Sequence, residues 1–417
     1  MKRILFLGFL LLQGAVFAQD LFDPANTRIV MAGVLTWEDP SLSPFSDHHR
    51  KDKELYQKFL DMGVPRENIT LMIDSEATKA KMEEAIATSM QACDENSTFI
   101  FYYAGHGVKA KKKYFFCNYD YSSKTKFDLD YLSSTAEKKC KGKRIILLAD
   151  CCYSGALLQV GEKISKEGKE AIVLSSATSS NISTGNWTYT QTLLDNFSGF
   201  SQGDRDQNGE ITLQELVTEI KDAMKYRERQ LSGFAAYGAE ASKVVVQKLK
   251  KGEKKSTESM HGFTIDQYVY ALNKSADWKP ARIKSINGGD ITVEFYNYSD
   301  KAEEIVERKL VRAIETPDYS KYTKVKVLWE KKEYAASIKK TEGDFYFIQY
   351  DGYDETWNEW IMYDRIITGD EKNALAKWNT GWYKAQVLQE KDGKYFITYT
   401  GYDHTWDEWA EKSRIKF

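Results

Sequence analysis

Two residues with the chemistry of a nucleophile and a base each follow an apolar run of this sequence. Cys152 comes shortly after the run 145–149, IILLA, and His106 shortly after the run 99–103, FIFYY. Short apolar runs of this kind predict strands buried on both faces of a parallel sheet, whose carboxyl ends border the ligand-binding crevice. A cysteine attacks as its thiolate, and an imidazole can take the thiol proton and return it to a leaving amine. The sequence therefore predicts a Cys/His dyad at one edge of a sheet.

Glycines accompany both residues and predict close approach of a substrate. Gly105 and Gly107 flank His106, and Gly155 follows Cys152. Because glycine leaves the main chain accessible, we expect the N–H groups of Gly107 and Cys152 to form an oxyanion hole. A buried structural cysteine beside a strand-end histidine is the alternative, and the pairing of the two motifs argues against it.

The motifs YYAGHG and ADCCYSG resemble those of caspase-like cysteine peptidases, and more closely those of metacaspases and bacterial caspase-domain proteins than those of animal caspases. Tyr153 stands where the metacaspase motif Asp-x-Cys-His-Ser-Gly has histidine. The resemblance covers about residues 27–246. It implies an α/β fold, with a mostly parallel sheet flanked by helices. It also implies a cysteine endopeptidase that acts on a polypeptide substrate, with Cys152 as nucleophile.

A carboxylate close to the predicted nucleophile indicates a cationic substrate group. Asp150 precedes Cys152 by two residues, and a carboxylate without a local partner is costly unless a cation pairs with it. In metacaspases the matching aspartate lines a pocket for an Arg or Lys before the scissile bond, and a second aspartate assists; Asp52 is the best match to the second. Bidentate contact would favour Arg, and a deeper pocket would accept Lys. Local hydrogen bonding of Asp150 and an ordinary helix position for Asp52 are the alternatives.

The segment 204–215, DRDQNGEITLQE, carries oxygen-bearing residues at the spacing of a calcium-binding loop. Such a loop alternates oxygen ligands around a hard cation, and Gly209 permits its sharp turn. An Asp/Gly-rich turn that opens a helix over 213–226 is the alternative. Calcium-dependent relatives in the family imply a role in activation. The predicted Ca²⁺ ligands are Asp204, Asp206, Asn208, Glu210 through its carbonyl, Thr212 and Glu215.

The first 18 residues have the features of a secretory signal peptide. Lys2 and Arg3 precede an apolar run over 4–12, and cleavage is expected after Ala18. The apolar run is shorter than the roughly 20 residues needed to cross a bilayer. We therefore expect a secreted or periplasmic protein without a membrane span. Five cysteines are too few for a disulfide scaffold, and pairing among three of them stays open: Cys93, Cys117 and Cys140.

Aromatic residues are concentrated near the C-terminus, where eight of the ten tryptophans follow residue 277. GYDETWNEW at 352–360 recurs as GYDHTWDEW at 401–409, and a degenerate copy precedes both. Each copy has short aromatic-rich segments divided by Gly/Asp turns, which predicts a small barrel. The copies resemble Tudor, chromo-barrel and SH3-like modules, whose aromatic cages bind methylated Lys or Arg. Most of these aromatics are expected in barrel cores, with a peptide- or glycan-binding face at Tyr353, Trp357, Tyr402 and Trp406.

The expected order of domains is a signal peptide (1–18), a caspase-like peptidase domain (19–248), a linker (249–264), a degenerate Tudor-like repeat (265–318) and two further repeats (319–368 and 369–417). Strands are expected at 28–37, 69–73 and 172–176, with helices at 49–62, 77–93 and 213–226. In the family a subunit-separating cut can fall within 156–169, and a lysine-rich surface helix is the alternative there.

The charge of the chain bears on its partners. A net charge of −2 gives no basic signature, so no nucleic-acid partner is expected. The rival hypothesis to an active peptidase is an inactive caspase-like scaffold that presents the barrels to a peptide or glycan.

Overall fold

The computed structural model describes residues 19–249, 259–260, 262–297 and 300–417, and the predicted signal peptide lies outside them. The N-terminal half is built on a six-stranded sheet in the order β11-β9-β8-β4-β2-β3. β11 pairs antiparallel with β9, and the other neighbours run parallel. The strands are β2 (Thr27–Gly33), β3 (Ile69–Ile73), β4 (Thr98–Ala104), β8 (Arg144–Asp150), β9 (Glu170–Ser175) and β11 (Gly233–Tyr237).

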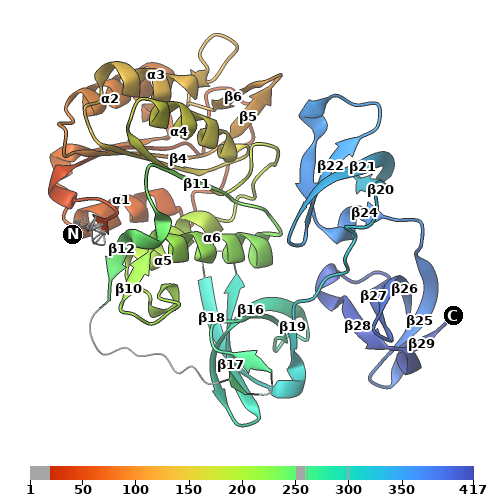
Figure 1. The fold of residues 1–417 in the computed structure, drawn as a ribbon. Helices are drawn as coiled ribbons and strands as arrows, with labels where there is room; N and C mark the ends of the chain where they lie inside the picture. The colour runs from red at the N-terminus through yellow and green to blue at the C-terminus, as the bar shows by residue number, and fades with distance from the viewer. Residues whose placement is uncertain (1–18, 250–258, 261, 298–299) are drawn as a thin grey trace, which may run out of the picture.

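Both faces of this sheet are buried, because its strands send apolar side chains into two cores. In β4, Phe101 and Tyr103 join one core, whereas Ile100 and Tyr102 join the other. Figure 1 shows α2, α3 and α4 on one face of the sheet and α1, α5 and α6 on the other. This arrangement confirms the predicted α/β fold. The helices are α1 (Lys51–Asp61), α2 (Lys79–Gln91), α3 (Asp130–Lys139), α4 (Leu157–Lys166), α5 (Thr188–Phe197) and α6 (Leu213–Glu228).

The helices and strands that the sequence predicts are confirmed with small shifts at their ends. The helix expected at 77–93 begins after Thr78, whose side chain caps it by accepting the N–H of Lys81. The strand expected at 28–37 ends at Gly33, so that Trp37 lies in the loop beyond the sheet. Two small sheets complete this half: β1 (Gln19–Asp20), β12 (Val244–Lys248) and β10 (Glu210–Thr212) form one, and β5 (Gly107–Ala110), β6 (Lys113–Phe116) and β7 (Phe127–Asp128) form the other.

Three five-stranded antiparallel sheets form the C-terminal half. In each, the first strand pairs with both the second and the fifth, so the sheet curls around a core of its own. The predicted fold class, with small barrels after an α/β domain, is therefore confirmed (Figure 1).

The barrel strands have these bounds. The first barrel contains β15 (Tyr268–Leu272), β16 (Trp278–Asn287), β17 (Asp290–Asn297), β18 (Asp300–Glu307) and β19 (Val311–Ala313). The second contains β20 (Lys324–Trp329), β21 (Lys332–Glu342), β22 (Phe345–Tyr350), β23 (Glu359–Ile361) and β24 (Ile366–Ile367). The third contains β25 (Lys372–Trp378), β26 (Gly381–Lys391), β27 (Lys394–Tyr399), β28 (Glu408–Glu411) and β29 (Ile415–Lys416).

The first barrel begins earlier than its predicted boundary at residue 265. A hairpin of β13 (Ser259–Met260) and β14 (Phe263–Thr264) lies within the stretch expected as a linker. Phe263 packs into the core of the first barrel. The end of the linker is thus part of the barrel, because the side chain of Phe263 is buried there. Residues 250–258 and 261 lie outside the described residues.

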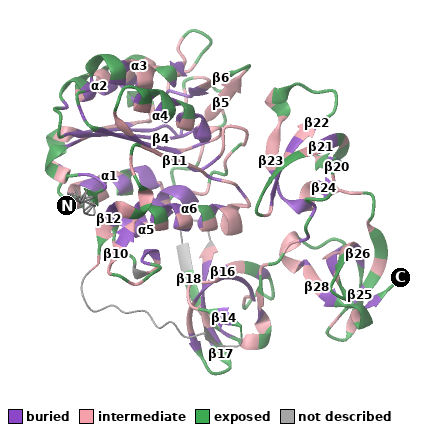
Figure 2. Cartoon of the chain, viewed as in Figure 1, coloured by how far each residue is buried: buried purple, intermediate pink, exposed green. Residues whose placement is uncertain are grey.

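Helix α6 joins the barrels to the N-terminal half. Glu219 pairs with Arg282 of the first barrel at 2.7 Å, and each side chain is 5% exposed. Lys225 pairs with Asp344 of the second barrel at 2.6 Å. Figure 2 shows buried residues along the sheet and exposed ones on the outer sides of the barrels. No helix among the described residues is long and apolar enough to cross a membrane.

Candidate active site

The neighbouring strands β4 and β8 carry His106 and Cys152 to the same edge of the sheet. Ala104 at the end of β4 pairs in register with Asp150 at the end of β8, so each residue of the predicted dyad lies two positions beyond a matched pair. The two turns touch, because a Cβ on Gly107 would lie 1.8 Å from the carbonyl oxygen of Cys152. Glycine is required at this close approach. The structure therefore brings together the two segments that carry the predicted dyad.

The thiol of Cys152 lies among main-chain N–H groups. The N–H of Ser183 donates to its Sγ at 3.2 Å. Burial raises the pKa of Cys152, whereas hydrogen bonds from the main chain of Ser183, Cys152 and Gly107 lower it. Main-chain donors that converge on one point are suited to stabilising negative charge. The main chains of Gly107 and Cys152, the predicted oxyanion donors, thus contribute to lowering the pKa of the thiol.

Two aromatic rings and one carbonyl hold the imidazole of His106. The ring packs against Trp37 and Phe45, with centroid distances of 4.4 and 4.5 Å. Its Nε2 lies 2.9 Å from the carbonyl oxygen of Ser43. Since a carbonyl can only accept, Nε2 of the neutral ring carries the proton and Nδ1 is the acceptor. Among the described residues, no hydrogen bond joins His106 to Cys152 directly.

These three supporting residues lie in or beside the loop that follows β2. Ser43 acts through its main chain, so no side-chain pattern in the sequence marks it. Trp37 and Phe45 also contact each other, with centroids 5.9 Å apart. Two aromatics in a loop rich in Pro, Ser and Asp are the one signal by which the support of His106 could have been anticipated.

Asp150 and Cys152 line the same small cavity at this edge of the sheet. Thr190 donates to Oδ2 of Asp150 from its N–H at 3.3 Å and from its hydroxyl at 2.7 Å. Burial raises the pKa of Asp150 to about 6, and the bonds from Thr190 act in the opposite direction. A carboxyl whose pKa is raised by burial therefore lies beside the nucleophile. The remaining lining residues are Leu35, Phe45, Ala104, Gly105, Cys151, Ser183, Thr184, Gly185 and Trp187.

Asp52 has a different environment from the one that the resemblance implies. It lies in the first turn of α1, fully buried, and pairs with Arg50 at 2.7 Å. Arg50 also pairs with Asp74 at 2.8 Å and donates to the carbonyl of Gly33 at 3.1 Å. The charge of Asp52 is thus neutralised by Arg50 of the same chain. Asp52 does not line the cavity of Asp150, so the structure does not place the two predicted substrate-binding carboxylates in one pocket.

The loop that covers Cys152 is held from two sides. Gln230, just beyond α6, donates from Nε2 to the hydroxyl of Ser183 at 3.1 Å. On the other side Asn181 exchanges two hydrogen bonds with the main chain of Trp360, at 2.7 and 3.1 Å. Because Trp360 belongs to the second barrel, both α6 and that barrel fix the loop that contacts the nucleophile.

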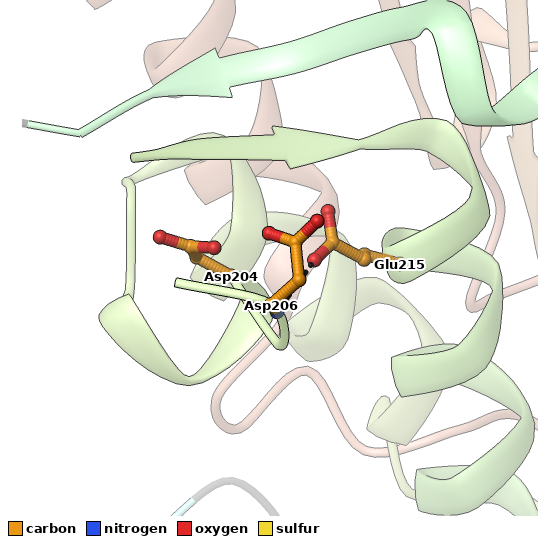
Figure 3. Close-up of side chains that lie close together, drawn as sticks. All are labelled: Asp204, Asp206 and Glu215. Carbon is orange, nitrogen blue, oxygen red and sulfur yellow. Dashed lines mark hydrogen bonds between the residues drawn. The ribbon is translucent and has the colours of Figure 1, made fainter. Parts of the chain in front are cut away.

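Three of the predicted calcium ligands converge in the loop before α6. Ligand oxygens of Asp204, Asp206 and Glu215 lie within 4.8 Å of one another, and Figure 3 shows the three carboxylates in this loop. Asp204 accepts the N–H groups of Asn208 and Gly209 at 3.1 and 2.9 Å, which closes the turn. Carboxylates gathered by such a turn fit a hard cation that takes oxygen ligands.

The other predicted metal ligands have further roles. The hydroxyl of Thr212 caps α6 by accepting the N–H of Glu215, and it donates to the carboxylate of Glu215 at 2.8 Å. Glu210 begins β10, where its main chain pairs with β12. The side chain of Asn208 donates to Asp206 at 3.0 Å. The loop is therefore braced by the same residues that carry its oxygens.

The four barrel residues with predicted ligand contacts form two equivalent pairs. Tyr353 and Trp357 are 44% and 54% exposed, with ring centroids 5.5 Å apart. Tyr402 and Trp406 have centroids 5.1 Å apart. Trp406 also contacts Trp278 of the first barrel, at 6.4 Å. The two pairs thus share a geometry but differ in what lies against them.

Comparison with known proteins gives two matching families. Residues 48–256, half of the chain, match the family described as the caspase domain, and residues 370–417 match the Tudor-knot, described as an RNA binding activity-knot of a chromodomain. No curated protein matches the chain. Among solved structures, protein GSU0716 from Geobacter sulfurreducens is 14% identical over 53% of this chain and all of that chain, with a TM-score of 0.39.

Proposed function

Because this chain belongs to the caspase-domain family, we propose that it is a cysteine endopeptidase with Cys152 as nucleophile and His106 as general base. One observation carries the proposal: paired strands deliver both residues to one edge of the sheet, where the turn at Gly107 touches the turn at Cys152. Family membership implies a polypeptide substrate. The Cys/His pair is what distinguishes an active enzyme from an inactive scaffold.

In the proposed reaction, Sγ of Cys152 attacks the scissile carbonyl carbon as its proton passes to Nδ1 of His106. The carbonyl oxygen becomes negative and is stabilised by the N–H groups of Gly107 and Cys152. His106 then gives the proton to the leaving amine, and a thioester to Cys152 remains. Water hydrolyses the thioester, with His106 again accepting a proton. The carbonyl of Ser43 orients the ring and stabilises the imidazolium through Nε2.

The test is to measure cleavage of fluorogenic peptides that end in Arg, Lys or Asp by the purified protein 19–417. We expect cleavage after Arg or Lys, because Asp150 lines the cavity beside Cys152. Failure to cleave any peptide, with calcium and reductant present, would favour the alternative of a caspase-like scaffold that binds a peptide or glycan.

We also propose that Ca²⁺ binds the loop 204–215 and promotes activity. The three converging carboxylates support binding. A link to the active site is supported by α6, which begins in this loop and is followed by Arg229 and Gln230. Gln230 contacts Ser183, and Ser183 donates to Cys152. Fixing the start of α6 would therefore steady the loop over the nucleophile.

Calcium is expected to raise the melting temperature of the protein, with a Kd of about 10⁻⁴–10⁻³ M, the range of extracellular calcium modules. Asp204→Asn and Glu215→Gln should each lose this shift, because each removes a carboxylate from the convergent group. Glu167→Gln, which neutralises an exposed residue after α4, should keep it. Equal shifts in all four proteins would contradict a site in this loop. Calorimetric titration with Ca²⁺ measures the same loss directly.

The proposal places the mature protein outside the cytoplasm and gives its barrels protein or glycan partners. The proposal of export is based on the signal-peptide features of residues 1–18. We expect mass spectrometry of the mature protein to give Gln19 as its N-terminus. The net charge of −2 argues against an RNA partner for the third barrel, despite the description of its matching family. Retention on RNA that weakens steeply with salt would contradict this assignment.

A further inference from the structure

The second barrel carries an aromatic cage, formed by Tyr334, Tyr350, Tyr353 and Trp357. Tyr353 lies 5.9 Å from Tyr334, 6.3 Å from Tyr350 and 5.5 Å from Trp357 between ring centroids. The hydroxyl of Tyr350 donates to Glu359 at 2.6 Å. The hydrogen bond of Tyr350 and the contacts between the rings hold the four side chains in place. The cage is therefore a preformed concave surface.

The third barrel repeats this cage with Tyr383, Tyr399, Tyr402 and Trp406. Tyr402 lies 6.2 Å from both Tyr383 and Tyr399, and 5.1 Å from Trp406. The hydroxyl of Tyr399 donates to Glu408 at 2.8 Å. The two cages thus have the same rings in the same relation, and one can serve as the reference for the other.

An indole from the first barrel packs at the cage of the third barrel. Trp278 is 2% exposed and meets Trp378 and Trp406 edge to face, at 6.1 and 6.4 Å. Arg312 stacks on Trp278 at 4.3 Å and donates to the carbonyls of Thr405 and Trp406. Edge-to-face contacts of this kind favour aromatic partners. The third barrel therefore takes an aromatic side chain of the chain itself at Trp378 and Trp406, whose counterparts in the second barrel are Trp329 and Trp357.

At the cage of the second barrel, Lys109 takes the place that Arg312 has at the third. Among the described residues, no tryptophan of another domain packs there as Trp278 packs at the third barrel. Lys109 donates to the carbonyl of Thr356 at 3.3 Å, and Thr356 is the counterpart of Thr405. Between this cage and the peptidase domain lies a cavity of about 430 Å³. The peptidase side of the cavity is formed by Tyr153, Ser180 and Ile182. A cavity of this size is within the range that holds small ligands.

The cavity lies beside the nucleophile. Tyr153, in its wall, directly follows Cys152 in the chain. The N–H of Tyr153 donates to the carbonyl of Asn181 at 2.8 Å, and Asn181 is bound to the main chain of Trp360. The second barrel is therefore attached to the loop that contacts the nucleophile.

From these contacts we infer that the cavity between Tyr153 and the cage of the second barrel is a subsite for an aromatic side chain, above all an indole, of the polypeptide substrate. This inference rests on the proposed peptidase function. The subsite adds a second specificity to the cation-binding pocket at Asp150. Its ligand is inferred from the equivalent position of the third barrel, where Trp278 packs against Trp378 and Trp406.

The subsite is tested with a series of alanine-rich peptides that each contain a single Arg. In each peptide of the series, one tryptophan replaces alanine at a different position. Tryptophan at one position should raise kcat/KM about tenfold over alanine, since it buries a large aromatic surface. Trp357→Ala should bring the Trp/Ala ratio of kcat/KM close to 1, and Ile182→Arg, on the peptidase side, should do the same. Trp357 is 54% exposed, so its removal leaves the barrel core intact. Trp382→Ala, at an exposed tryptophan of the third barrel, should keep the wild-type ratio.

Two results would overturn the inference while leaving the peptidase function in place. One is cleavage of the alanine peptide with no gain from tryptophan at any position. The other is a larger gain from trimethyllysine than from tryptophan, which would make the cage a cation site. If no peptide is cleaved, the subsite is tested instead by measuring the binding of N-acetyltryptophanamide to the full chain. A Kd of about 1 mM that is lost in Trp357→Ala would support the subsite, and no binding in either protein would overturn it.

Discussion

Cys152→Ala is expected to lower peptide cleavage by about 10⁴-fold or more, because no other group near the scissile bond can form the thioester. His106→Ala should cause a loss of similar order. Burial holds the pKa of Cys152 above its ordinary value, so the thiol needs a base in order to react. Initial rates with a fluorogenic Arg peptide measure both losses.

Cys140→Ala is the matched control for the nucleophile. The Cys140 thiol lies in the core beside the sheet, is 4% exposed and does not line the cavity of Asp150, so this variant should keep the cleavage activity. Alkylation provides a second readout: iodoacetamide should label Cys152 more slowly in His106→Ala than in the wild type. A Cys152→Ala protein that still cleaves, after mass spectrometry excludes a contaminating peptidase, would remove Cys152 from the mechanism.

Asp150→Asn is expected to lower kcat/KM for Arg and Lys peptides by about 10²–10³-fold, because a substrate cation would enter the cavity without a charge to pair with. The same carboxyl predicts a pH dependence. The pKa of Asp150 is raised from 3.8 to about 6, so the group is protonated below about pH 6 and charged above it. Affinity for a cationic side chain should therefore rise as the pH rises through about 6 and then level off.

Binding of an Arg peptide to Cys152→Ala, measured by calorimetry between about pH 5 and pH 8, isolates this effect from the chemistry of the thiol. The double variant with Asp150→Asn should show weak binding that does not change with pH. The sign for stability is opposite: protonated Asp150 favours folding, and this contribution is present below the ordinary pKa and is lost as the pH rises through about 6. Equal affinity at both ends of the range would exclude Asp150 as the cation partner.

The edge of the sheet that carries the dyad could be predicted because its strands are continuous apolar runs, which report burial on both faces. The close approach of the two turns could also be predicted from Gly107, because no side chain fits between its backbone and the carbonyl of Cys152. Ser43 contributes only a carbonyl, which every residue has, so its role depends on the path of a loop. Asp52 was predicted at the substrate pocket, but the cation that it binds, Arg50, is two residues away in its own chain.

The barrels show the same division between local and long-range information. Their repeat predicts short strands divided by turns and shows which aromatic residues are equivalent, because turns and alternation are local features. The packing of Trp278 against Trp406 joins two different barrels. Such contacts depend on how whole domains dock, and no periodic pattern in the sequence encodes them.

Trp278 is tethered beside the cage whose Trp406 it contacts, and this has a consequence for the other cage. A tethered indole is present at a high effective concentration, so a free peptide competes poorly for the third barrel. At the second barrel a free indole would have to lose its full translational freedom, and its affinity alone would be low. A substrate already held at Cys152 is tethered in the same sense as Trp278. The cage of the second barrel would thus select among polypeptides that have entered the cleft, and single amino acids in the surroundings would occupy it only weakly.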